Sequence, residues 1–95
     1  MNIGNAIKQI RTDKNISQAK LAELTGISPT SLSQIENGIK SPSTKSRKKI
    51  CSALLIPEAL IYFYGLEKSD VNVRNKKTYD IVYPAIMDMV RKLLL

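Results

Sequence analysis

The first two thirds of the chain alternate between apolar runs with helical spacing and short polar breaks. In the first run, Ile3, Ile7 and Ile10 follow the i, i+4, i+7 spacing of one helical face, which predicts a helix over about residues 2–14. The later runs predict four more helices, over about residues 18–25, 29–37, 43–55 and 57–64. This part of the chain is therefore expected to be all-α.

The second and third predicted helices are joined by a very short turn. Ser17 and Ser28 can each cap a helix by accepting a hydrogen bond from a backbone N–H one turn on. Gly26 can end the earlier helix because glycine adopts the left-handed conformation without steric cost. So short a turn forces a sharp crossing, which is typical of a helix-turn-helix. On the earlier helix we expect Leu21 and Leu24 to be buried.

The third predicted helix has an apolar side and a polar side. Leu32 and Ile35 form the apolar side, which we expect to face the core. The polar side is made of small hydroxyl and amide residues: Thr30, Ser31, Ser33 and Gln34. Either this polar face is solvent cover, or it binds a partner rich in hydrogen-bonding groups.

The last thirty residues follow a different pattern. Residues 67–78 are polar and predict a linker. After them, Tyr79, Ile81 and Tyr83 alternate as in a short extended segment, and Pro84 is expected to open a final helix. The chain is thus divided into a domain over residues 1–66 and a C-terminal segment over residues 67–95.

The final helix carries four apolar residues that we expect largely on one face: Ile86, Val90, Leu93 and Leu94. Such a helix either folds back on the domain or associates with a second copy, and we favour association. The three consecutive aromatic residues 62–64 exceed what one helical stripe can hide. Some of this aromatic surface is expected to meet the C-terminal segment or a partner.

The charge of the chain is strongly basic. Lys and Arg number 15 against 8 Asp and Glu, for a net charge of +7, and most of the excess lies in residues 1–50. A small folded domain with this charge indicates a polyanionic partner, of which nucleic acid is the commonest. The alternative is a basic surface that serves solubility alone.

Several classes of function are disfavoured by what the sequence lacks. It contains no histidine and a single cysteine, Cys51, so no ordinary zinc site and no histidine-assisted nucleophile can be assembled. No glycine-rich phosphate loop, signal peptide or membrane span is evident. We therefore expect a cytoplasmic protein that is not an enzyme, with no metal, no cofactor, no membrane contact and no small-molecule effector.

The segment SQAKLAELTGISPTSLSQIENGIKSPS carries a recognisable pattern. Its defining residues are Gln18, Leu21, Ala22, Gly26, Leu32, Ile35, Glu36, Asn37 and Gly38. On the basis of these residues, the region over about residues 3–64 resembles the helix-turn-helix domain of the phage lambda/434 repressor and Cro family, also called the Xre family. The resemblance implies a five-helix bundle whose third helix enters the major groove of double-stranded DNA, followed here by a C-terminal extension that ends in a helix.

The resemblance also implies the roles of individual residues. The base-facing positions are occupied by Pro29, Thr30, Ser33 and Gln34. Gln34 is the strongest candidate for direct readout because an amide can contact adenine N6 and N7 together. Pro29 departs from the polar residue often found at its position and has no backbone donor, so it would touch thymine methyls or the sugar edge.

Further positions are implied to hold phosphates, namely Gln18, Asn37, Lys40 and Ser43 or Thr44. In the basic run of residues 45–49, which adds long-range attraction, Lys45 is the lysine expected to approach a phosphate. Arg11 and Glu36 are implied to form a structural ion pair, which neutralises a carboxylate that would otherwise repel DNA. The expected function is a transcriptional regulator, favoured as a repressor, that acts as a homodimer on an inverted repeat. An antitoxin or restriction–modification controller and a protein-interaction module remain as alternatives.

Overall fold

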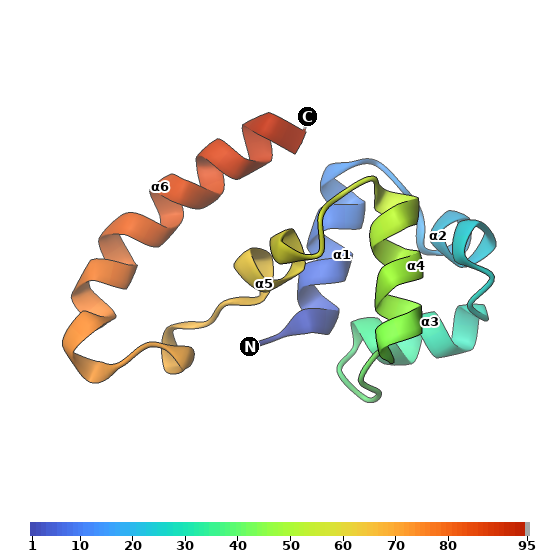
Figure 1. The fold of residues 1–95 in the computed structure, drawn as a ribbon, viewed down its shortest axis with the longest axis horizontal. Helices are drawn as coiled ribbons and strands as arrows, with labels where there is room; N and C mark the ends of the chain where they lie inside the picture. The colour runs from blue at the N-terminus through green and yellow to red at the C-terminus, as the bar shows by residue number, and fades with distance from the viewer. Residues whose placement is uncertain (95) are drawn as a thin grey trace.

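The computed structural model describes residues 1–94 and is built from helices (Figure 1). The six α-helices in this range are α1 (Ile3–Asp13), α2 (Gln18–Thr25), α3 (Pro29–Glu36), α4 (Thr44–Leu54), α5 (Ala59–Gly65) and α6 (Lys76–Leu94). Two short 3-10 turns, η1 (Lys68–Asp70) and η2 (Val73–Asn75), lie between α5 and α6. The predicted all-α fold is confirmed, and no strand occurs within residues 1–94.

The boundaries of α2 and α3 come from local chemistry. The hydroxyls of Ser17 and Ser28 accept hydrogen bonds from the backbone N–H of Lys20 and Ser31, at 3.0 and 3.1 Å. Gly26 ends α2 with φ of 73°, a left-handed conformation that suits glycine. These caps were predicted from the sequence and are confirmed.

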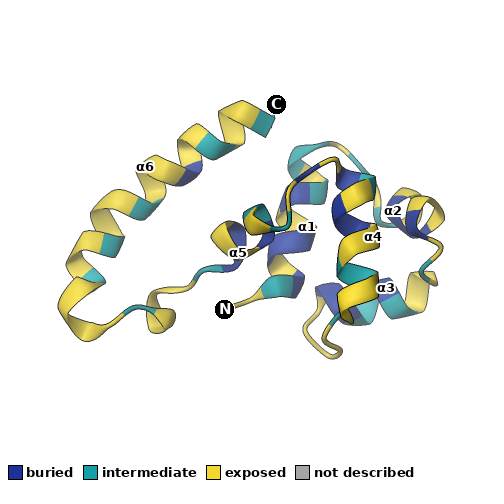
Figure 2. Ribbon diagram, viewed as in Figure 1, coloured by how far each residue is buried: buried dark blue, intermediate teal, exposed yellow. Residues whose placement is uncertain are grey.

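The core lies between the first five helices, where α1 buries Gly4, Ala6, Ile7 and Ile10 (Figure 2). The largest completely buried side chains of this core are Ile7, Ile10, Leu21, Leu32, Ile50, Leu54 and Ile61. The expectation that Leu24 is also buried is wrong, because it is 50% exposed. The eight-residue α2 buries only a narrow face, formed by Leu21, Ala22 and Thr25. Leu24 lies beside this face and therefore remains in contact with solvent.

At Gly4, α1 approaches the backbone of α3 closely, a contact that no local sequence pattern indicates. A β-carbon on Gly4 would lie 2.1 Å from the carbonyl oxygen of Ile35 and 2.9 Å from that of Glu36. Only glycine therefore lets α1 rest directly on the last turn of α3. This contact helps fix the orientation of α3 relative to the bundle.

The C-terminal segment differs from the prediction. Residues 79–84 are not extended and Pro84 does not open a helix, because one continuous α6 runs from Lys76 to Leu94 with Pro84 inside it. Proline removes a hydrogen bond to the carbonyl four residues before it, and the helix continues through it without a break. Before it, the rings of Tyr79 and Tyr83 stack with their centroids 4.8 Å apart. The predicted linker is replaced by η1, η2 and the first turn of α6.

One face of α6 folds back on the bundle. The Tyr83 hydroxyl donates a hydrogen bond of 2.7 Å to the carbonyl of Phe63 in α5, and Met87 is only 2% exposed. Near the end of the helix, Arg91 lies 3.9 Å from a carboxylate oxygen of Asp13 in α1. The aromatic residues of α5 are divided accordingly, with Tyr64 buried and Tyr62 and Phe63 exposed.

The four apolar residues predicted to lie largely on one face of the last helix span an arc of about 100°, and the bundle covers only one edge of that arc. Val90 and Leu94 pack against the core cluster, whereas Ile86 and Leu93 are exposed on another side of the helix. The helix is therefore apolar over two adjacent stripes, of which the structure covers only one.

Candidate nucleic-acid interface

The polar face of α3 is held outward by its apolar face. Leu32 and Ile35 are buried against the bundle, so the opposite side of this short helix faces solvent. Pro29 and Thr30 are exposed at its start, and Ser33 and Gln34 are half-buried one turn later. The four residues that were expected to face bases thus lie together on the outer side of α3.

The hydrogen-bonding groups of this face are partly unengaged. Within residues 1–94, the side-chain hydrogen bonds of α3 and its cap involve Ser28, Ser31, Ser33 and Glu36, and none uses Thr30 or Gln34. Ser33 accepts only a long bond of 3.4 Å from the Asn37 amide. Thr30 and Gln34 therefore keep their full donor and acceptor capacity for an external partner.

The turn after α3 brings a cation to the same surface. Gly38 adopts φ of 76°, and the backbone N–H groups of Ile39 and Lys40 both donate to the carbonyl of Gln34. This tight turn directs Lys40 back along α3, where its ammonium donates a hydrogen bond of 3.0 Å to the Ser31 hydroxyl. A positive charge is thereby fixed beside the polar face.

A buried ion pair connects α1, α2 and the end of α3. Arg11 donates to both carboxylate oxygens of Glu36, at 2.8 and 2.9 Å, and to the carbonyl of Ile16 at 3.0 Å. The Glu36 side chain is 1% exposed. A third donor, the amide of Gln18, reaches Glu36 at 3.1 Å. The carboxylate is thus fully compensated and fixes the two helices of the helix-turn-helix on α1.

The other residues predicted to contact phosphate differ in their exposure and in the hydrogen bonds that their side chains already make within the chain. Asn37 and Lys45 are exposed. Ser43 is occupied as the cap of α4, because its hydroxyl accepts from the Ser46 N–H at 3.1 Å. Gln18 has one amide hydrogen bond committed to Glu36, which the sequence reading did not anticipate. It still lies in the first turn of α2, where unpaired backbone N–H groups favour an anion.

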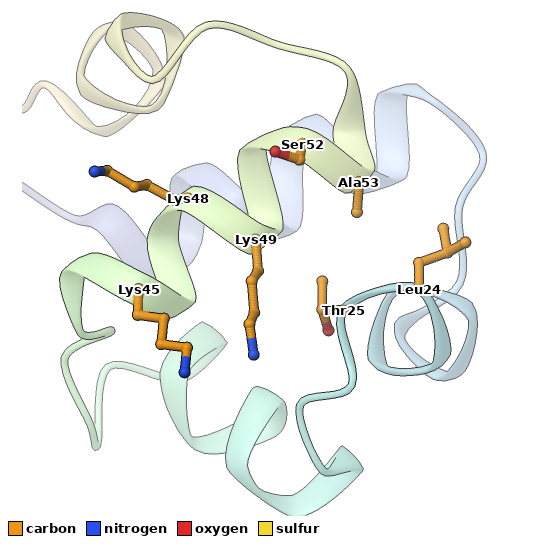
Figure 3. Close-up of a pocket in the computed structure, with 7 residues that line it drawn as sticks. All are labelled: Leu24, Thr25, Lys45, Lys48, Lys49, Ser52 and Ala53. Carbon is orange, nitrogen blue, oxygen red and sulfur yellow. The ribbon is translucent and has the colours of Figure 1, made fainter.

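A lysine-rich hollow lies beside these elements, between α2 and α4. It has a volume of about 530 Å³ and is lined by Leu24, Thr25, Lys45, Lys48, Lys49, Ser52 and Ala53 (Figure 3). Lys45 and Lys49 extend toward α2 and α3, whereas Lys48 extends in another direction (Figure 3). The hollow therefore adds positive potential next to the helix-turn-helix.

Other kinds of site are not evident in the part of the chain that the structure describes. Residues 1–94 contain no group of three or more His, Cys, Asp or Glu side chains that could hold a metal ion. None of the helices in this range combines the length and the apolar character needed to cross a membrane.

Comparison with known proteins identifies the class to which this geometry belongs. A family model described as helix-turn-helix matches residues 7–61, which is more than half of the chain. The protein therefore belongs to the helix-turn-helix family of lambda-repressor-like regulators. Members of this class bind DNA and regulate transcription.

Three curated relatives show how far the similarity extends. The ImmF control region 10 kDa protein of Bacillus phage phi105 is 44% identical over 54 residues, covering 57% of this chain and 58% of its own length. The transcriptional activator BcrR of Enterococcus faecalis is 33% identical over 97 residues, covering 95% of this chain and 46% of its own. The transcriptional repressor RghR of Bacillus subtilis is 33% identical over 66 residues, covering 67% and 49%.

The chain spans about half the length of these relatives. The match with BcrR covers 95% of this chain and so includes most of α6, whereas that with the phage protein covers 57% of the chain.

Proposed function

We propose that this protein is a sequence-specific transcriptional repressor that inserts α3 into the major groove and binds an inverted-repeat operator as a homodimer. The observation that supports this most directly is the outer face of α3, where Thr30 and Gln34 present side chains with no intramolecular hydrogen bond among residues 1–94. Base edges in the major groove offer matching donors, acceptors and thymine methyls.

Each side chain of this face has a distinct role in the proposal. The Gln34 amide contacts adenine N6 and N7 together, and the Thr30 methyl packs on a thymine methyl. Pro29 contributes an apolar contact at the first position of α3, and the hydroxyl of the half-buried Ser33 contacts a base edge on the same face.

The phosphates on either side are held by the surrounding elements. Gln18 at the start of α2, Asn37 and Lys40 after α3, and Ser43 and Lys45 at the start of α4 contact the backbone of the duplex. Neither α2 nor α4 has an acidic residue in its first turn, so their N-termini stay attractive to phosphate.

The dimeric part of the proposal follows from the size of the reading element. One short helix covers only a few base pairs, so useful selectivity requires two copies related by a two-fold axis, with half-sites about one helical turn apart. Repression needs only that the bound dimer blocks the polymerase, and one relative is named a repressor. As a regulator of transcription, the protein would act in the cytoplasm, where bacterial and phage promoters are read.

The test is selection of bound duplexes from a randomised library at physiological salt, where non-specific phosphate attraction is weak. Enrichment of an inverted repeat is expected. On the enriched site, the double variant Thr30→Ala with Gln34→Ala should lose about 1–3 kcal/mol per removed base contact. Gln9→Ala, which removes an exposed amide of α1 outside the helix-turn-helix, serves as the matched control. Recovery of unselected sequences by the folded protein would contradict the proposal.

A further inference from the structure

The outward side of α6 carries an apolar stripe that the bundle leaves uncovered. Its members are Val82, Ile86, Met89 and Leu93, all exposed, with Leu93 85% exposed. We call these four residues the outer stripe. They are spaced by four, three and four residues, which is the a/d spacing of a helix that packs along another helix. The charged residues of α6 all project from other sides.

The outer stripe is distinct from the side of α6 that packs on the bundle. The inward side is formed by Tyr83, Met87, Val90 and Leu94, which belong to the core cluster or pack against it. At about 100° per residue, the outer stripe lies roughly a quarter turn from this side. One helix therefore supports two helix-packing surfaces, and only one has a partner within the chain.

A groove opens next to one end of the outer stripe. It lies between α5, the η1–η2 segment and α6, has a volume of about 250 Å³, and its lining is apolar at Phe63, Leu66, Val71, Tyr79, Val82 and Ile86. An apolar cavity of about 150 Å³ already accepts a molecule the size of benzene, so this groove can accept a leucine side chain. At the opposite end of the stripe, about 16 Å along the helix, Leu93 protrudes into solvent.

We propose that the occupant of this surface is a second copy of the chain, paired antiparallel through α6. In a two-fold arrangement whose axis passes between Ile86 and Met89, each Ile86 lies against the Met89 of the other copy. The same axis brings each Leu93 over Val82 and into the groove of the other copy. A protruding residue and a recess at equal distances from one axis are the self-complementarity that a two-fold interface requires.

This inference adds an interface to the proposed function. It rests on that function in one respect only, the requirement for two copies of α3 on the DNA. The exposed Phe63 of α5 borders the groove, so the interface would continue from α6 onto the bundle. Such continuity would set the relative orientation of the two copies of α3, because α5 packs directly on α1 and α1 contacts α3 through Gly4.

The first test is sedimentation equilibrium of the full chain without DNA, over a concentration series up to about 100 μM, well above the dissociation constants of stable complexes. The protein should dimerise, and Met89→Lys and Leu93→Lys should each weaken the dimer at least about tenfold. Ile81→Lys is the matched control, because Ile81 is also exposed on α6, at 74%, but lies outside the outer stripe. A monomeric wild type, or a dimer indifferent to both stripe variants, would overturn the inference.

The second test fixes the direction of pairing. In a Cys51→Ala background, Val82→Cys and Leu93→Cys proteins are mixed under mild oxidation. Disulfide-linked dimers should form between the two different variants and not within either one alone. Preferential linking of like with like would exclude the antiparallel arrangement. Both tests are independent of DNA: a dimer that enriches no operator contradicts only the proposed function, and a protein that is monomeric in solution yet enriches an inverted repeat contradicts only this inference.

Discussion

The helix-turn-helix and the C-terminal helix differ in how many interactions attach them to the rest of the molecule. α2 and α3 are short, of eight residues each, and are fixed by side-chain caps, buried leucines and a fully compensated carboxylate. α6 has 19 residues but only one that is fully buried, Met87. The first region therefore presents polar groups on a rigid support, and the second presents apolar side chains on a lightly attached helix. The first surface suits the edges of bases, and the second suits another apolar helix.

The largest effect should come from breaking the support of the first region. Arg11→Ala leaves the buried Glu36 carboxylate with only the Gln18 amide, and removing one partner of a buried ion pair costs about 3–5 kcal/mol. The free energy of unfolding, measured by urea denaturation, should fall by that amount. Lys8→Ala, an exposed cation on the same helix, should stay within about 0.5 kcal/mol of the wild type. Equal effects of the two changes would mean that the ion pair does not hold α3.

The second prediction tests whether α6 is part of the folded unit. Met87→Ala should lower the free energy of unfolding by about 2–5 kcal/mol, because Met87 is buried between α6 and the bundle. Ile81→Ala removes an exposed side chain on the same helix and should change stability by less than about 0.5 kcal/mol. Both values come from the same denaturation experiment. A neutral Met87→Ala would show that α6 does not dock on the bundle in solution.

These two regions also differ in how well the sequence predicts them. The helix-turn-helix was predictable because its boundaries depend on local signals: the caps at Ser17 and Ser28 and the left-handed Gly26. The C-terminal segment was not, because local rules read Pro84 as the start of a helix. The actual state of residues 79–84 depends on contacts with α5, more than ten residues away in sequence.

The same distinction holds within the candidate site. That Thr30 and Gln34 face outward follows from their helical distance to Leu32 and Ile35. The engagement of the Gln18 amide by Glu36 and the close contact at Gly4 do not follow from any local pattern. Both depend on where α1 lies relative to α3, which is a tertiary property.

The third prediction concerns the strength with which the first region attracts DNA. Lys45→Gln should weaken binding to all duplexes by a similar factor and reduce the slope of log affinity against log salt by about 1, as for the loss of one phosphate contact. Lys77→Gln makes the same charge change in the first turn of α6 and should leave the slope unchanged. Titrations at several salt concentrations give both slopes. Equal slopes for the two variants would assign Lys45 to long-range attraction only.

The smallest effect is expected at the junction of the two regions, where Tyr64 of α5 donates a hydrogen bond of 3.2 Å to Asp13 of α1, beside Arg91 of α6. Burial, reinforced by the Asp13 carboxylate, raises the pKa of Tyr64 from its ordinary value of 10.0 to about 12. The folded state therefore disfavours the phenolate. The stability that comes from burying the neutral phenol is complete below pH 10 and is lost as the pH rises toward 12.

Tyr64→Phe removes this titration while keeping the ring. At neutral pH the variant should be less stable by about 1 kcal/mol, the worth of one hydrogen bond. Between pH 10 and 12 its stability should fall less steeply than that of the wild type, so the two curves should converge. The burial that raises the pKa of Tyr83 remains in both proteins and cancels in the comparison. Parallel curves over this range would show that α1, α5 and α6 do not enclose the Tyr64 hydroxyl. The contact between the helical bundle and α6 would then differ from the one described above.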